Sequence, residues 1–221
     1  MYSGVQAASS SGLSVQMGAD GGVSIFNRRA VAGGGTAMRV EWEAIAADGG
    51  VLEAGAMDAL VPEPSRAVRL EDVLLLRSEC FARLTLVGDD DSVLDRKVYW
   101  LDGSELPDYG WLGKMRSAKE GRVVVDVEGG RSGGWLFANV SVVAQAIVFM
   151  PRVEVWEVDS GQVLPSFVGK LSVLMLAGES NVVSVEVRIG DDLDVEIRVS
   201  GWNMEELRFA CWYMNVISDG L

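Results

Sequence analysis

Apolar residues alternate with polar ones along several segments, and this pattern constrains the fold more than any other feature of the chain. The segments are rich in Val, Ile and Trp, end at Gly, Asp, Asn or Ser, and span residues 21–27, 37–46, 82–87, 121–129, 151–158, 181–189 and 193–202. A period of two is typical of strands with one buried and one solvated face. We therefore expect an all-β fold. Only residues 65–74 offer a short helical turn, and they fit a strand equally well.

Three stretches share a hairpin pattern. A strand-like run meets a short group of Asp, Gly or Ser, and Val-Leu then opens the return, at residues 38–52, 83–94 and 151–164. Short polar residues and glycine tolerate the backbone angles of tight turns. Repeated hairpins within about 90 residues are typical of an immunoglobulin-like antiparallel β-sandwich. The chain is long enough for two such sandwiches in tandem.

The hairpins and the breaks between them divide the chain. We expect a flexible N-terminus at 1–11, a first sandwich at 12–103, a linker at 104–113, a second sandwich at 114–203 and an apolar C-terminal tail at 204–221. Proline and glycine interrupt the periodicity of the linker. The tail contains a mostly apolar run at 207–217 that must be covered by its own domain or by another chain.

Composition excludes several classes of function. The chain has no histidine, the commonest general base and a frequent zinc ligand. Its net charge of −13 disfavours nucleic acid and anionic membranes as partners. No apolar run reaches 18 residues, and the N-terminal residues lack a secretory pattern, so we expect no membrane span and no signal peptide. Cys80 and Cys211 favour two buried free thiols over one disulfide.

The motifs that might carry catalysis lack the context that they need. Residues 130–134, GRSGG, match the nucleophile elbow of hydrolases, which requires a histidine and a strand-to-helix turn. Strand-like residues flank this motif, so we expect a hairpin turn. Glutamates such as Glu41 and Glu154 occupy alternating strand positions, where solvated acids are expected instead of a catalytic pair. We predict no catalytic residue and no cofactor in this chain.

Three consecutive aspartates, Asp89–Asp91, raise the question of a metal site. A calcium loop of the EF-hand type needs oxygen ligands at alternate positions, a central glycine and a distant glutamate. Val93 occupies the next alternate position and Trp100 the place of the glutamate. We predict a solvated hairpin turn here and no metal ligands.

The seven tryptophans suggest a binding function, because an aromatic face suits the apolar face of a pyranose ring. Trp42, Trp100 and Trp202 occupy strand positions, where core packing is expected. The candidates for contact with carbohydrate or a protein partner are Trp111 and Trp135, in glycine-rich segments, and Trp212 in the tail.

Three motifs, in order along residues 20–203, resemble those of a known family. They are VLDRKVYWL (93–101), GQVLPSFVGKLSVLMLAGES (161–180) and VSGWN (199–203). Together they resemble the C-terminal immunoglobulin-like β-sandwich domains of family 2 glycoside hydrolases, of the exo-β-D-glucosaminidase, β-mannosidase and endo-β-mannosidase type. The chain departs from the family pattern at Lys97, at Ala177 and at the pair Gly169-Lys170.

The resemblance implies a non-catalytic part of such a glycosidase. In the family the two catalytic glutamates lie on a (β/α)8 barrel that precedes these domains, so a barrel-containing chain or segment is the expected partner. An extracellular, vacuolar or lysosomal location rests on the resemblance alone. Two alternatives stay open: a free-standing carbohydrate-binding or adhesion module, and a structural subunit of an unrelated assembly.

Overall fold

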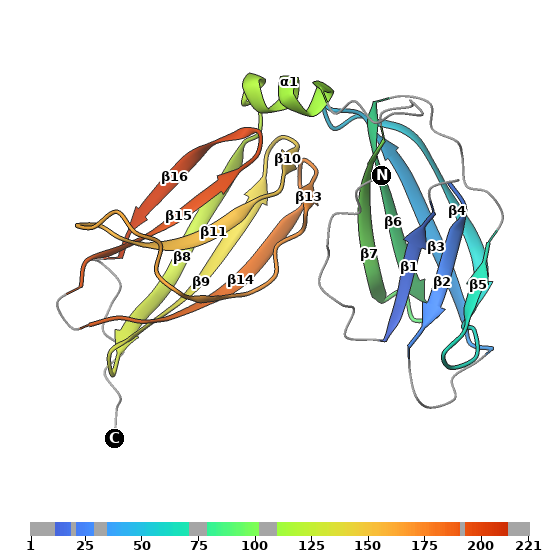
Figure 1. Cartoon of the computed structure of the whole chain (residues 1–221), viewed down its shortest axis with the longest axis horizontal. Helices are drawn as coiled ribbons and strands as arrows, with labels where there is room; N and C mark the ends of the chain where they lie inside the picture. The colour runs from blue at the N-terminus through green and yellow to red at the C-terminus, as the bar shows by residue number, and fades with distance from the viewer. Residues whose placement is uncertain are drawn as a thin grey trace. The chain divides into compact units, whose positions relative to one another are not determined.

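The computed structural model describes residues 12–18, 21–28, 35–70, 79–101, 110–190 and 193–211. The chain forms two compact units, residues 1–113 and 114–221 (Figure 1). Both units are built from antiparallel β-sheets, and α1 (Gly110–Ala118) is the only helix in the described ranges. The predicted all-β fold of β-sandwiches is confirmed. No helix within these ranges has the length and apolarity that a membrane span requires.

Unit 1 stacks a three-stranded sheet on a four-stranded one. The smaller sheet has the order β1-β2-β5 and contains β1 (Leu13–Met17), β2 (Val23–Asn27) and β5 (Ala67–Arg69). The larger has the order β4-β3-β6-β7 and contains β3 (Ala37–Ile45), β4 (Val51–Leu60), β6 (Cys80–Gly88) and β7 (Val93–Leu101). Strand β5 lies within residues 65–74, which had fitted a helical turn or a strand; residues 71–78 lie outside the described ranges.

The core of unit 1 lies between these sheets. Val15 and Ile25 of the smaller sheet join Leu84 and Leu86 of the larger sheet in one buried cluster. Trp42 packs against the same cluster, as its strand position predicts. These residues occupy alternate positions of their strands, so one face of each strand supplies the core.

Two polar side chains of β7 connect it to β1 across the sandwich. The backbone N–H of Val15 donates to Asp95 Oδ2 at 3.1 Å, and the N–H of Met17 donates to the Tyr99 hydroxyl oxygen at 3.0 Å. Both Asp95 and Tyr99 are buried. A buried backbone donor without a partner is costly. These side chains stabilise β1 because they accept hydrogen bonds from N–H groups that do not bond to a neighbouring strand.

We call the face of the larger sheet that turns away from β1, β2 and β5 the second face of unit 1. Across it, Glu43 pairs with Arg83, and Phe81 pairs with Trp100. Phe81 is fully buried, and Arg83 is 7% exposed. Strand β6 is therefore buried on both faces.

Unit 2 also stacks two main sheets. One has the order β12-β14-β9-β8 and contains β8 (Val123–Ser132), β9 (Trp135–Ala144), β12 (Phe167–Val168) and β14 (Ser180–Arg188). The other has the order β11-β15-β16 and contains β11 (Arg152–Glu157), β15 (Val195–Gly201) and β16 (Met204–Ala210). A short pair joins β10 (Val148–Phe149) to β13 (Leu174–Met175). Fully buried residues from both main sheets form the core, among them Val140, Val185, Val155 and Ile197.

Two of the three predicted hairpins are confirmed, and the third is incomplete. Strands β3 and β4 pair over their length, as do β6 and β7. After β11, the expected return makes only one bridge, between Trp156 and Val163. Pro165 follows at once and has no N–H to donate. The chain then crosses to the other sheet, where β12 pairs with β14.

The motif at 199–203 contains the end of β15 and the turn to β16. Asn203 is 1% exposed; its Oδ1 accepts a hydrogen bond from the N–H of Phe149, and its Nδ2 donates to the carbonyl of Ile147, both at 2.9 Å. The Asn203 carbonyl accepts from the N–H of Gly121 at 2.8 Å. Through its side chain and its backbone carbonyl together, Asn203 thus connects three separate segments of unit 2.

Two elements of the structure lie wholly or partly within the parts expected to be tail and linker. Residues 204–210, assigned to the tail, form β16, which pairs with β15 and places Met204 in the core. Helix α1 begins at Gly110, inside the expected linker. Residues 1–11 and 212–221 lie outside the described ranges. The division into linker, tail and flexible terminus therefore stays a prediction.

Candidate binding surface

The three candidate tryptophans have different outcomes in the structure. Trp111 lies in α1 and not in a loop; it is 3% exposed, and its indole packs edge-on against Phe81 at 5.0 Å between ring centroids. In this position the ring offers no exposed face to a ligand. Trp212 lies outside the described ranges. Trp135 is half-buried at the start of β9.

The turn between β8 and β9 places Trp135. Gly133 and Gly134 have φ angles of 56° and 78°, a region that favours glycine, which confirms the hairpin turn predicted for residues 130–134. The N–H of Ile189 donates to the carbonyl of Gly134 at 2.8 Å and attaches the turn to the end of β14. Trp135 consequently stands opposite Arg188 in the paired strands.

Trp135 belongs to a larger exposed surface. We call the outer face of β8, β9, β12 and β14 around Trp135, Phe137 and Phe167 the aromatic face of unit 2. The ring centroids of Trp135 and Phe137 are 6.3 Å apart, with planes inclined by 26°. Phe137 is 41% exposed and Phe167 is 75% exposed. The register places Glu186 directly between the two phenylalanines.

Sequence reasoning missed both phenylalanines. Phe137 is two residues after Trp135, and residues two apart on a strand lie on the same face, so the sequence could have identified Phe137. Phe167 had no such signal, because it reaches the face only when the chain crosses from one sheet to the other after Pro165.

Polar and acidic side chains continue the aromatic face. On the next row of paired residues, Glu128 is opposite Asn139, and Asn139 is opposite Ser184. The Ser184 hydroxyl donates to Asn139 Oδ1 at 3.1 Å. Asp126 lies one row further along β8. Glu128, Asp126 and Glu186 form no ion pair within the described ranges.

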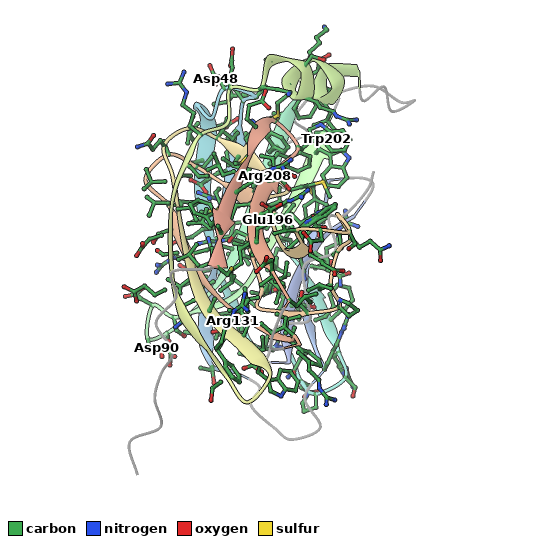
Figure 2. The ribbon with its side chains drawn as sticks, turned by 90° about the vertical axis from the view of Figure 1, so that its left-hand side faces the viewer. Asp48, Asp90, Arg131, Glu196, Trp202 and Arg208 are labelled. Atoms are coloured by element: carbon green, nitrogen blue, oxygen red, sulfur yellow. The ribbon has the colours of Figure 1, made fainter. Side chains whose placement is uncertain are left out.

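On the opposite sheet of unit 2, an arginine covers the indole of Trp156. The Arg198 guanidinium lies 3.8 Å from the ring centroid of Trp156, a cation–π contact that covers the indole. Arg198 also pairs with Glu196, and Arg208 pairs with Glu206 at 2.9 Å. Glu196 and Arg208 are labelled in Figure 2. These charges are engaged with one another on the surface of β15 and β16.

Its strand position predicted that Trp202 packs in the core, and this prediction is wrong. It lies in the turn after β15, is 39% exposed, and packs edge-on against Phe149. The Arg116 guanidinium lies 4.8 Å from its ring centroid. The turn, which begins directly after Gly201, lifts the indole out of the strand alternation.

The three aspartates form the predicted hairpin turn between β6 and β7. Asp90 Oδ1 accepts hydrogen bonds from the N–H of Ser92 at 3.1 Å and from its hydroxyl, and these bonds hold the pKa of Asp90 below its usual range. Asp91 pairs with Arg39 at 3.0 Å. No group of three or more His, Cys, Asp or Glu residues in the described ranges is arranged to hold a metal ion. Cys80 and Cys211 are buried free thiols, as expected.

Comparisons with known proteins yield structural similarity alone. No protein family and no curated protein matches the sequence. The exo-chitosanase CsxA of Amycolatopsis orientalis, also described as an exo-β-D-glucosaminidase, matches 90% of this chain at a TM-score of 0.71 and 17% identity. A β-D-mannosidase from Dictyoglomus thermophilum matches 88% at a TM-score of 0.51 and 13% identity.

The matched region is only part of each neighbour. This chain spans 26% of the exo-chitosanase and 22% of the mannosidase. The motifs at 93–101, 161–180 and 199–203 resemble those of these same two types of enzyme. The resemblance is therefore confirmed at the level of the fold: this chain has the β-sandwich architecture found in part of these glycosidases.

Proposed function

We propose that this chain is a non-catalytic β-sandwich portion of a family 2-type glycosidase, of the exo-β-D-glucosaminidase or β-mannosidase type. The observation that carries the proposal is the extent of the structural match, which takes in 90% of this chain but 26% of the exo-chitosanase. The remainder of such an enzyme has room for a catalytic (β/α)8 barrel. The two sandwiches would brace that barrel, on another chain or on another segment of the same protein.

The positions of the resemblance motifs support this role. Tyr99, in the first motif, is buried and accepts a hydrogen bond from β1. Asn203, in the last motif, connects three segments of unit 2. Both side chains act on the fold and not on a substrate. A chain that serves as a rigid support would retain such residues without any catalytic group of its own.

Purification from the natural source tests the proposal. Antibodies against unit 2 should capture a polypeptide that contains a barrel sequence, either joined to these domains or tightly bound to them. The captured material should hydrolyse 4-nitrophenyl β-D-glucosaminide or β-D-mannoside, whereas the recombinant 221-residue chain should not. Mass spectrometry identifies the barrel, and prior depletion with the same antibody is the control. Capture of this chain alone, or hydrolysis by the recombinant chain, would contradict the proposal.

A further inference from the structure

We propose that the aromatic face of unit 2 binds oligosaccharides of cationic amino sugars, such as glucosamine units without N-acetyl groups. The proposal does not depend on an association with a barrel, because every residue that it uses belongs to unit 2. It rests on two features of the face: exposed aromatic rings, and carboxylates without ion-pair partners in the described ranges that lie between and beside these rings.

The aromatic rings supply the stacking surface. Phe167 and Phe137 project from β12 and β9, which flank β14, and Trp135 continues the row along β9. Neighbouring strands lie about 4.8 Å apart, so the two phenylalanines are separated by about 10 Å. That distance suits an extended chain of several pyranose rings. A ring with its C–H bonds on one face packs against an aromatic face and removes apolar area from water on both sides.

The carboxylates select the charge of the ligand. Glu186 stands between the phenylalanines, with Glu128 and Asp126 on the following rows. The single cation on these paired rows is Arg188, opposite Trp135, so three acids and one base give the face a charge of −2. Since none of the three acids forms an ion pair in the described part of the chain, each can accept a hydrogen bond from a ligand ammonium group.

Charge complementarity therefore favours an amino sugar over other glycans. The protonated amine of a sugar stacked on Phe137 or Phe167 would lie within reach of Glu186. A neutral glycan would gain only the stacking contact, and an acidic one would be repelled by this face and by the net charge of −13. Acetylation of the amine removes its charge and its attraction to the carboxylates.

Calorimetric titration of the whole chain tests the proposal. The ligands are the glucosamine hexamer, the N-acetylglucosamine hexamer and mannohexaose, at mildly acidic pH where the sugar amines are protonated. We expect the glucosamine hexamer to bind at least about tenfold more tightly than the other two, with an affinity that falls as salt is added. Equal affinity for the three ligands, or no binding, would overturn the proposal.

Three variants locate the site. Phe167→Ala should weaken binding of the glucosamine hexamer by about tenfold or more, because one stacking surface is lost. Glu186→Gln should weaken it by about fivefold and reduce the preference over the acetylated hexamer to about twofold, because Glu128 and Asp126 remain. Leu60→Ser, which removes an exposed apolar side chain of unit 1, is the matched control and should leave binding unchanged.

The variants are suited to this test because Phe167 is 75% exposed and its loss leaves the core intact. Unchanged melting temperatures verify that each variant is folded. Binding that is unchanged in Phe167→Ala, or a preference that is undiminished in Glu186→Gln, would place the ligand elsewhere and overturn the proposal. It would equally fail if ultracentrifugation showed a dimer that Phe167→Ala dissociates, because the face would then be occupied by a second copy.

Discussion

The four-stranded sheets of the two units each give one face to a core, but their other faces differ. In unit 1, β6 is buried on both faces, so Phe81 on the second face is as inaccessible as Leu84 on the core face. In unit 2, β9 alternates between buried and accessible residues, and Phe137 is 41% exposed. Similar sheets thus place phenylalanine in two different environments.

Local contacts account for the burial in unit 1. Trp111 of α1 covers Phe81, and the neighbouring Arg83 lies 2.6 Å from Glu43. The aromatic face of unit 2 has no helix packed on it within the described ranges, and its acids lack ion-pair partners there. Phe81 on the second face of unit 1 is therefore buried, whereas Phe137 on the outer face of unit 2 is exposed, as the proposed ligand site requires.

The largest effect expected from this difference concerns the two phenylalanines. Phe81→Ala should lower the free energy of unfolding of unit 1 by about 3–5 kcal/mol, because it leaves a cavity beneath Trp111. Phe137→Ala should cost unit 2 about 1 kcal/mol, chiefly its contact with Trp135. Urea denaturation followed by circular dichroism measures both. Similar losses in the two variants would show that the faces do not differ.

The second prediction compares two ion pairs on the second face of unit 1. Glu43→Gln removes the charge opposite Arg83, whose side chain is 8% exposed, and should destabilise unit 1 by about 1–3 kcal/mol. Glu41→Gln is the matched control, because Glu41 pairs with Arg39 and both side chains are at least 40% exposed. Its effect on the urea midpoint should fall within experimental error, since water screens the pair. A larger effect at Glu41 than at Glu43 would contradict the assignment of burial.

Alternation of apolar and polar residues predicted seven of the sixteen strands in the described ranges, and the hairpin pattern added the starts of β4 and β7. All seven alternating segments contain strands, because alternate burial is set by the residues themselves. Strand β4 carries no clear alternation and includes Gly55, which lies opposite Trp42; a Cβ at that glycine would come within 2.6 Å of the indole. The hairpin pattern predicted only where this strand begins, and its length depends on its pairing with β3.

Helix α1 and the aromatic face escaped prediction for related reasons. Gly110 and Gly113 are poor helix formers, and the helix is accompanied by burial of Trp111 and Leu112. Trp135 was identified from its glycine-rich segment, whereas Phe167 became its neighbour only through the crossing to another sheet. Contacts made by chain crossing depend on topology, which single-sequence periodicity does not contain.

A third prediction concerns Tyr99, on the core face of β7, and the dependence of stability on pH. Burial raises the pKa of the Tyr99 hydroxyl above its ordinary value of 10.0. The stability associated with the neutral phenol is fully present below pH 10, and it is lost as pH rises through the folded pKa, because only the unfolded state releases the proton easily. Tyr99→Phe should remove this part of the slope.

Thermal melts of the wild type and of Tyr99→Phe between neutral and alkaline pH measure the effect. Burial also raises the pKa of the Cys211 thiol in unit 2, so unit 2 of the wild type should also lose stability at alkaline pH. The difference between the two curves isolates Tyr99, since the thiol is common to both proteins. A difference that stays constant as pH rises would show that the hydroxyl is not buried in the folded state.

The smallest effect is expected at the exposed end of the second face of unit 1, where the three aspartates turn between β6 and β7. Asp90→Ala removes the acceptor of two hydrogen bonds from Ser92 and should lower the melting temperature of unit 1 only slightly, because the turn is solvated. Millimolar calcium should leave the melting temperature of the wild type unchanged, since Asp90 and Asp91 are already engaged by Ser92 and Arg39. A rise of several degrees with calcium that disappears in the double variant Asp89→Ala, Asp91→Ala would instead identify the turn as a metal site, and this end of the face would then carry a ligand as the aromatic face is proposed to do.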